Sequence, residues 1–326
     1  MKVYLESIGC APPWHDQLIL LRDLASKDKV GRHCVVAERV SADIVLSVFH
    51  EDPRFCNLAY PLEHDRRRFA FCSYDNGFPA LPGLYPSLTP WNADSRFARS
   101  APYLPKPWDD DDVDLDRKDP AFLFSFVGSA LTSPIRRRIL DLRHKRGFVR
   151  DSSNDDGYRS AQPQDVYQRF QKSYRTVLAD SQFVLCPRGV GTSSIRLFET
   201  MRAGRVPVVI SDHWIPPLRV PWEEFIVCIP EKEIAGIPRR LESLAERARE
   251  MGHRARQQWE MNFSENRVFN WLVDQVVEMG RVDAGAFRKW KARRLTDWRN
   301  LRRVTLPILK QKTLRTAGRY WNRAPG

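Results

Sequence analysis

The chain has 326 residues, 42% hydrophobic and 29% charged, which is the composition of a globular protein with room for two domains. It holds no run of 18 apolar residues, and its six cysteines show no CxxC spacing, so we expect buried thiols in a reducing compartment and no transmembrane helix, disulfide framework or zinc site. The net charge of +13 lies almost wholly in residues 281–326, with 14 basic and two acidic side chains, against 39 basic and 38 acidic ones in the other 280 residues, and this argues against a body that binds nucleic acid.

The first hundred residues show short apolar runs and one helical pattern. Residues 16–25 carry leucines at the spacing of an amphipathic helix. The first apolar run meets an acidic residue almost at once, so we interpret it as a strand rather than a signal peptide. Alternating strands and helices predict a parallel α/β domain. The predicted strands are residues 3–5, 34–37, 44–48 and 68–72.

Residues 101–120 form the predicted boundary, because prolines followed by an acidic run favour neither a helix nor a central strand. The α/β alternation resumes after it. Residues 149–165 are polar and are predicted to form a loop. The predicted strands are residues 122–127, 183–186, 206–210 and 225–229, and the predicted helices are residues 135–144, 193–203, 231–251 and 263–279.

The most informative stretch is residues 181–212, where a buried strand leads through a glycine-containing loop into a helix and then into a second strand. Each hydroxyl residue at 192–194 can cap this helix, and Gly204 is expected to end it with a positive φ. Loops that follow parallel strands lie together at the edge of the sheet where ligands bind. Glycine amides and a helix N-terminus favour a phosphate group at that edge.

Charged side chains in this stretch fit a nucleotide diphosphate. Arg188 and Arg196 can bind phosphate in a bidentate manner, and Glu199, on the same helical face as Arg196, can accept hydrogen bonds from two ribose hydroxyls. The same pattern also fits ordinary ion pairs among Arg196, Glu199 and Arg202 on a helix surface. The loop matches neither the P-loop nor the dinucleotide fingerprint, so the residue types alone leave both interpretations open.

Several blocks of this chain form a recognisable pattern. They are Cys-Pro-Arg-Gly at 186–189, Ser-Ile-Arg-Leu-Phe-Glu at 194–199, residues 203–212, Phe-Ser-Phe-Val-Gly at 124–128 with Arg136, and Pro217-Leu218 with Trp-Glu-Glu-Phe at 222–225. Together they resemble the exostosin family of glycosyltransferases. The resemblance covers roughly residues 120–240, and residues 1–100 resemble the family only loosely. It implies a GT-B architecture, in which two Rossmann-like α/β domains face a cleft, and an inverting transfer that needs no metal or other cofactor.

The family pattern assigns a role to each part of the chain. Residues 1–118 are predicted to form the acceptor-side domain, residues 119–262 the domain that binds a nucleotide-diphosphate sugar, and residues 263–326 a closing helix and a basic tail. A second loop after the strand at 122–127 adds to the donor site. The predicted donor-binding residues are Gly128, Arg136, Arg188, Gly189, Gly191, Thr192, Ser193, Ser194, Arg196 and Glu199.

An inverting transfer needs a general base that removes a proton from the acceptor hydroxyl. Asp75 and Glu51 are the candidates, because each follows a predicted strand of the first domain, although both are also typical turn residues. The DxD patterns within residues 109–116 are typical of metal-dependent GT-A transferases. No apolar strand precedes them, so a solvated linker is favoured and no metal ligand is predicted.

The basic tail suggests a further partner. Four apolar residues, Phe287, Trp290, Trp298 and Leu301, lie near one face of a predicted cationic helix, so residues 285–305 either bind an anionic membrane surface or pack on the body. A membrane contact would suit a saccharide acceptor linked to lipid. Animal and plant members of the family usually carry an N-terminal anchor, whose absence here predicts a cytoplasmic, bacterial enzyme of surface-polysaccharide assembly, peripheral on the inner face of the membrane. The alternative is a non-catalytic basic protein that binds a lipid surface or nucleic acid.

Overall fold

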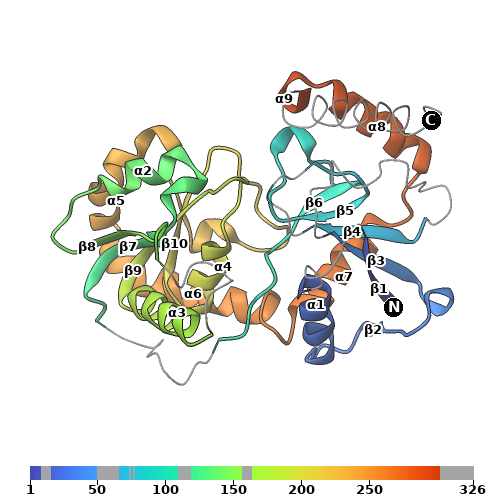
Figure 1. The fold of residues 1–326 in the computed structure, drawn as a ribbon, viewed down its shortest axis with the longest axis horizontal. Helices are drawn as coiled ribbons and strands as arrows, with labels where there is room; N and C mark the ends of the chain where they lie inside the picture. The colour runs from blue at the N-terminus through green and yellow to red at the C-terminus, as the bar shows by residue number, and fades with distance from the viewer. Residues whose placement is uncertain are drawn as a thin grey trace, which may run out of the picture.

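Two parallel β-sheets organise the chain (Figure 1). The first sheet has the strand order β2-β1-β3-β4-β5-β6 and the second β11-β10-β9-β7-β8, and every pairing between these strands is parallel. The expected α/β class with two Rossmann-like units is confirmed. The computed structural model describes residues 1–8, 16–49, 66–72, 75, 78–108, 119–155 and 164–301.

The central strand of the first unit, β3, is buried from Ile44 to Val48, and its apolar side chains pack on both faces of the sheet around the buried Ser47. The two short strands at one edge of this sheet, β5 and β6, were not predicted. The first of them begins at Gly83, with φ of +155°, where a Cβ atom would lie 2.5 Å from the backbone nitrogen of Ala70, so only glycine fits. The elements are β1 (Lys2–Ile8), α1 (Asp16–Ser26), β2 (Cys34–Val35), β3 (Ile44–Phe49), β4 (Arg68–Cys72), β5 (Gly83–Tyr85) and β6 (Ala98–Ser100).

The second unit confirms the predicted strands at 122–127, 183–186 and 206–210. The loop predicted for residues 149–165 is wrong at both ends. Residues 149–151 belong to a strand that is held by Phe148, whose ring packs 5.0 Å from that of Phe122. Residues 164 and 165 begin a helix. The elements are β7 (Phe122–Gly128), α2 (Pro134–Leu140), β8 (Gly147–Asp151), α3 (Gln164–Ala179), β9 (Ser181–Pro187), α4 (Ile195–Arg202), β10 (Val206–Ile210) and β11 (Val227–Cys228).

The helix α4 connects β9 to β10, and both strands are neighbours in the sheet, as predicted. Gly204 follows it with φ of +63°, which confirms the expected helix end. The predicted hydroxyl cap is wrong: Ser194 occupies the N-cap position, yet its side chain accepts no hydrogen bond from the first turn. The first backbone amides of α4 therefore remain available to other partners.

The single helix predicted over residues 231–251 is broken into several pieces. A 3-10 helix, Glu231–Gly236, precedes α5 (Ile237–Glu242), and α6 (Ala248–Asn262) follows after another short 3-10 turn. Pro238 stands in the first turn of α5 and has no N–H group, so a helix can begin there but cannot continue through it.

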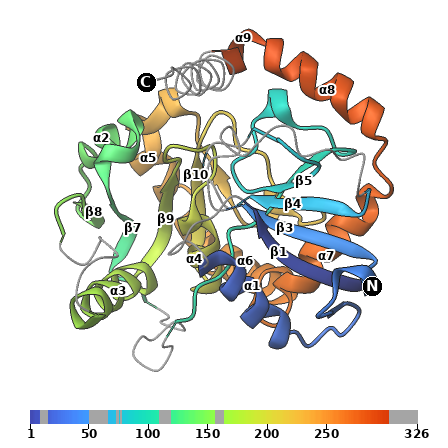
Figure 2. The same cartoon turned by 45° about the vertical axis from the view of Figure 1, so that its right-hand side comes forward.

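The chain then returns to the first unit (Figure 2). The helix α7 (Val268–Met279) contacts α1 and β5, and α8 (Ala284–Thr296) packs on Phe97, next to β6 of the first sheet, followed by the short α9 (Trp298–Asn300). One apolar cluster extends from the first sheet through α7 and α8 to α6. The boundaries predicted at 118/119 and 262/263 stay predictions.

The predicted membrane-facing side of residues 285–305 is divided in the structure. Phe287 is fully buried and Trp290 is 8% exposed, because both rings pack on Phe97 at centroid distances of 5.6 and 5.5 Å. Trp298 and Leu301 are 79% and 40% exposed. Half of the expected apolar face is thus used inside the protein. Among the described residues, no helix has both the length and the apolar character needed to span a bilayer.

Candidate functional site

The loop from Gly189 to Ser194 follows β9 and leads into α4 at the carboxyl edge of the second sheet. Within the described part of the chain, no backbone amide of residues 189–194 donates a hydrogen bond to another protein group. The hydroxyl of Ser193 is buried and likewise has no hydrogen-bond partner there. Unbonded donors gathered ahead of a helix N-terminus form a place where an anion can bind.

Arg136 holds this loop against the loop that follows β7. Its guanidinium donates to the carbonyl oxygens of Ser129 at 3.2 Å, Pro187 at 3.3 Å and Arg188 at 3.1 Å, and the residue is only 7% exposed. Gly189 lies directly over it, because a Cβ atom on this glycine would be 3.2 Å from Nη2 of Arg136. Arg136, which was predicted to bind the donor, therefore fixes the backbone of both loops.

Arg196 is also buried, at 7% exposure, and lies beneath the end of β7. It donates to the carbonyl oxygen of Val127 at 2.5 Å, and its guanidinium lies 5.0 Å from the ring centroid of Phe126. Gly128 approaches this guanidinium closely, since a Cβ atom would lie 2.6 Å from Nη2 of Arg196 and would displace the arginine from its present position. The interpretation of Arg196, Glu199 and Arg202 as helix-surface ion pairs is therefore wrong for both arginines, since Arg202 is also only 6% exposed.

Glu199 accepts a hydrogen bond from the hydroxyl of Tyr174 at 2.6 Å. Burial, followed by the negative charge of Glu199, raises the pKa of Tyr174 well above its usual value, so the phenol keeps the proton that it donates. The sequence interpretation missed Tyr174. The signal was the spacing of Tyr167, Phe170 and Tyr174, which marks one face of a helix.

Arg188 is paired with Glu231, another residue that the sequence interpretation missed. Nε and Nη2 of the arginine lie 2.6 and 3.1 Å from the two carboxylate oxygens. Glu231 also bonds to the loop after β10, where its amide donates to Asp212 at 2.8 Å. An incoming phosphate would therefore compete with Glu231 for Arg188.

The glycine loop also contacts the first unit. Gly191 packs so closely on it that a Cβ atom would lie 2.5 Å from the carbonyl oxygen of Asp75 and would overlap Ser87. The hydroxyl of Thr192 donates to the carbonyl oxygen of Leu88 at 3.0 Å. One of the two predicted bases, Asp75, is thus beside the loop predicted to bind the donor.

Asp75 is held by Tyr103, which comes from the segment between the two sheets. The phenol donates to Oδ1 of Asp75 at 2.7 Å and lies 2.8 Å from the hydroxyl of Ser87. Burial and the charge of Asp75 raise the pKa of Tyr103 well above its usual value, so it remains a donor. The other predicted base, Glu51, lies outside the described residues.

Comparisons with known proteins show which sequences and structures this chain resembles. A family model of the exostosin GT47 domain matches residues 80–244. Exostosin-1 homolog of Caenorhabditis elegans is 41% identical over 85 residues, and Exostosin-2 of Bos taurus is 28% identical over 177 residues, which are 26% and 51% of this chain. These matches cover 22% and 24% of the two relatives' own lengths. The crystal structure of TarM is similar at a TM-score of 0.39 and 10% identity, over 74% of this chain and 56% of that one.

Proposed function

Because the chain belongs to the exostosin GT47 domain family, we propose that it is a glycosyltransferase that moves a sugar from a nucleotide-diphosphate sugar to a saccharide acceptor. The observation that carries the proposal is that the amides of residues 189–194 bond to no group among the described residues and lie beside Asp75 of the other unit. An anion site and a carboxylate that meet across two domains are the two parts that such a transfer needs.

The donor diphosphate would lie on the loop of residues 189–194, where backbone amides and the N-terminus of α4 stabilise negative charge. Arg188 would exchange its ion pair with Glu231 for one with the diphosphate, because its planar guanidinium can bind either anion. Glu199 keeps one carboxylate oxygen for the ribose while Tyr174 holds the other. Arg136 fixes the backbone just ahead of this loop, at Pro187 and Arg188, and Arg196 fixes the end of β7 at Val127.

The chemical step would begin at Asp75. Oδ2 of this carboxylate takes the proton of the acceptor hydroxyl, while Tyr103 holds Oδ1. The acceptor oxygen then bonds to the anomeric carbon, and the bond from that carbon to the donor phosphate oxygen breaks. The nucleoside diphosphate leaves with the electron pair, and the loop amides stabilise its charge. Attack opposite the leaving group inverts the anomeric configuration, and no metal or other cofactor takes part in this scheme.

Calorimetry with a panel of nucleoside diphosphates tests the donor site. We expect the wild-type protein to bind at least one of them, and Glu199→Gln to bind it about tenfold or more weakly, since a charge-assisted hydrogen bond contributes roughly 1.5–3 kcal/mol. The exposed Glu246→Gln is the matched control. Absence of binding to the whole panel by a folded wild-type protein would refute the donor site.

Transfer itself is tested with Asp75→Asn. This variant should bind the nucleoside diphosphate as the wild type does but lose transfer, and the wild-type product should have the inverted anomeric configuration by NMR. Full transfer by Asp75→Asn would rule out this base and favour Glu51.

The cellular setting is a separate part of the proposal. Trp298 is exposed, and exposed cations such as Arg293 precede it in α8, which supports contact with an anionic membrane and with an acceptor linked to lipid. We place the enzyme in the bacterial cytoplasm, peripheral on the inner face of the membrane, in surface-polysaccharide synthesis, with no specific nucleic-acid partner. Co-sedimentation with vesicles that contain anionic lipid should fall for Trp298→Ala, and equal sedimentation of both proteins would refute the contact.

A further inference from the structure

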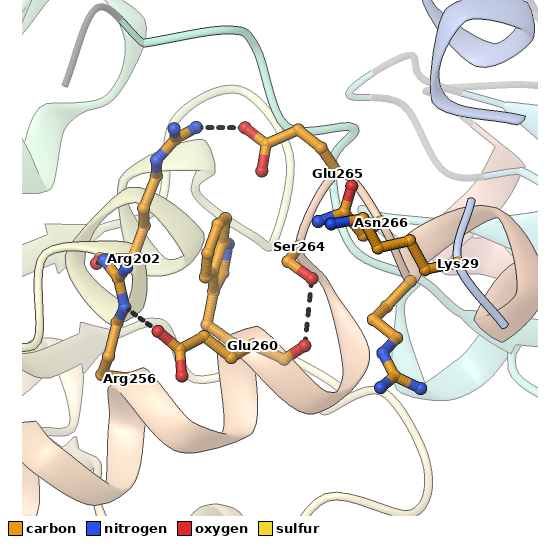
Figure 3. Close-up of a pocket in the computed structure, with 9 residues that line it drawn as sticks. Lys29, Arg202, Arg256, Glu260, Ser264, Glu265 and Asn266 are labelled. Carbon is orange, nitrogen blue, oxygen red and sulfur yellow. Dashed lines mark hydrogen bonds and ion pairs between the residues drawn. The ribbon is translucent and has the colours of Figure 1, made fainter. Parts of the chain in front are cut away.

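A second polar pocket, of about 370 Å³, lies at the end of α4 opposite to the glycine loop (Figure 3). Since α4 spans Ile195–Arg202, its two ends are separated by about 12 Å at 1.5 Å per residue. Figure 3 shows Arg202 and Arg256 on one side of the pocket and Asn266 and Lys29 on the other. The pocket is therefore distinct from the donor site.

One wall of this pocket is rigid. The guanidinium groups of Arg202 and Arg256 lie 5.1 and 5.2 Å from the ring centroid of Trp259. Arg202 is 6% exposed, donates to the carbonyl oxygen of Lys106 at 3.1 Å and forms an ion pair with Glu265. These partners hold the arginine side chain in one conformation before any ligand arrives.

The charges of the pocket do not cancel. Arg202 is balanced by Glu265, and Arg256 by Glu260 at 2.6 Å. Lys29 and Arg267 also line the pocket, are exposed, and form no ion pair with any described residue. Two positive charges therefore remain without a counter-charge at the open side of the pocket, which favours the entry of an anion.

The two uncompensated cations come from different parts of the fold. Lys29 follows α1 of the first unit, whereas Arg267 lies in the turn between α6 and α7. The backbone amide of Lys29 donates to the carbonyl oxygen of Asn266 at 3.0 Å, which fixes these two segments against each other. A ligand that bonds to both cations would stabilise this junction.

We propose that this pocket binds a diphosphate group through Lys29 and Arg267. A diphosphate carries at least two negative charges, and a volume of about 370 Å³ admits it together with part of an attached group. Guanidinium and ammonium groups are the side chains that bind phosphate oxygens most strongly. The ligand is either inorganic pyrophosphate or a diphosphate ester such as a nucleoside diphosphate. The inference stands without the proposed function, because none of these residues belongs to the donor loop.

Calorimetry on the intact chain tests the proposal with sodium pyrophosphate in one series and a nucleoside diphosphate in another. The test variant is Lys29→Ala with Arg267→Ala. Lys145→Ala with Arg249→Ala is its control, since it removes an exposed lysine and an exposed arginine outside the pocket. The variant should lose one binding event or weaken it at least tenfold, while the control binds as the wild type does. The series that shows the loss identifies the source of the diphosphate.

Several outcomes decide between the two sites. Two binding events in the wild type, one of them sensitive to Lys29 and Arg267, would support both sites. A single event that depends on these cations would support the pocket and count against the donor site. A single event that ignores them, or no binding of either probe, would overturn the pocket. Both substituted side chains are exposed, so the fold should be retained, and unchanged circular dichroism would verify this.

Discussion

Gly191 gives the sharpest test of how the two units meet. An alanine Cβ at this position would lie 2.5 Å from the carbonyl oxygen of Asp75, about 0.9 Å short of ordinary contact at 3.4 Å, and would also overlap Ser87. A backbone carbonyl cannot rotate away as a flexible side chain can. The glycine loop must therefore move away from the first unit.

The expected cost follows from this overlap. Forcing one methyl group into a close-packed contact costs about 1–3 kcal/mol, and Gly191→Ala should lower the free energy of unfolding by that amount. Gly236→Ala is the matched control, because a Cβ atom there meets nothing within 4 Å and its φ is −83°. Gly191 also lacks a positive φ, so backbone strain does not separate the two substitutions.

Urea unfolding followed by fluorescence and circular dichroism measures both variants. Adding Ser87→Gly to Gly191→Ala should recover part of the lost stability, because it removes one of the two groups that overlap. Nucleoside diphosphate binding should be weaker in Gly191→Ala than in Gly236→Ala and should recover in part when Ser87→Gly is added. The reason is that the loop that moves is the loop that carries the amides. If the free energies of unfolding of Gly191→Ala and Gly236→Ala differ by less than about 0.5 kcal/mol, the close approach of the two units is refuted.

Three further substitutions or labels probe separate regions. Trp290→Ala should destabilise the fold by about 3–5 kcal/mol in urea unfolding, because its ring is buried, whereas the exposed Trp298→Ala should stay within about 0.5 kcal/mol of the wild type. Hydrogen bonds from Arg299 lower the pKa of Asp297 to about 2, so its carboxylate stabilises the folded state above its ordinary pKa of 3.8; the stability difference from Asp297→Asn should vanish as pH falls through about 2. Burial raises the pKa of Cys186 to about 12, although Arg196 opposes the shift, so peptide mapping after maleimide treatment of the native protein should find this thiol unlabelled, and rapid labelling would contradict its burial.

Apolar runs predicted three strands of the second sheet well, because β7, β9 and β10 are buried on both faces and consist mostly of hydrophobic residues, whereas β8 lies partly in a predicted loop. The short strands β5 and β6 were missed, since three residues carry no periodicity and their pairing depends on neighbours distant in sequence. Propensity could not establish these contacts.

The candidate site shows the same limit. Arg188, Arg196, Glu199 and the glycines at 189 and 191 could be selected from residue types and spacing, whereas Gly128 and Arg136 came from the family resemblance. Which arginine remains open to a ligand could not be predicted, because it depends on tertiary partners. Arg136 bonds to three carbonyl groups, Arg196 lies under Gly128, and Arg188 pairs with Glu231 from a distant 3-10 helix.

The return of α7 and α8 to the first sheet affects the order in which the chain can fold. The second unit is complete in sequence by the end of α6, whereas the first unit needs Phe287 and Trp290 for its core. During synthesis on a ribosome, the half made first must therefore wait with apolar surface exposed until the last helices emerge, and the half made second can finish before it. Chaperone dependence should accordingly be concentrated in the N-terminal half.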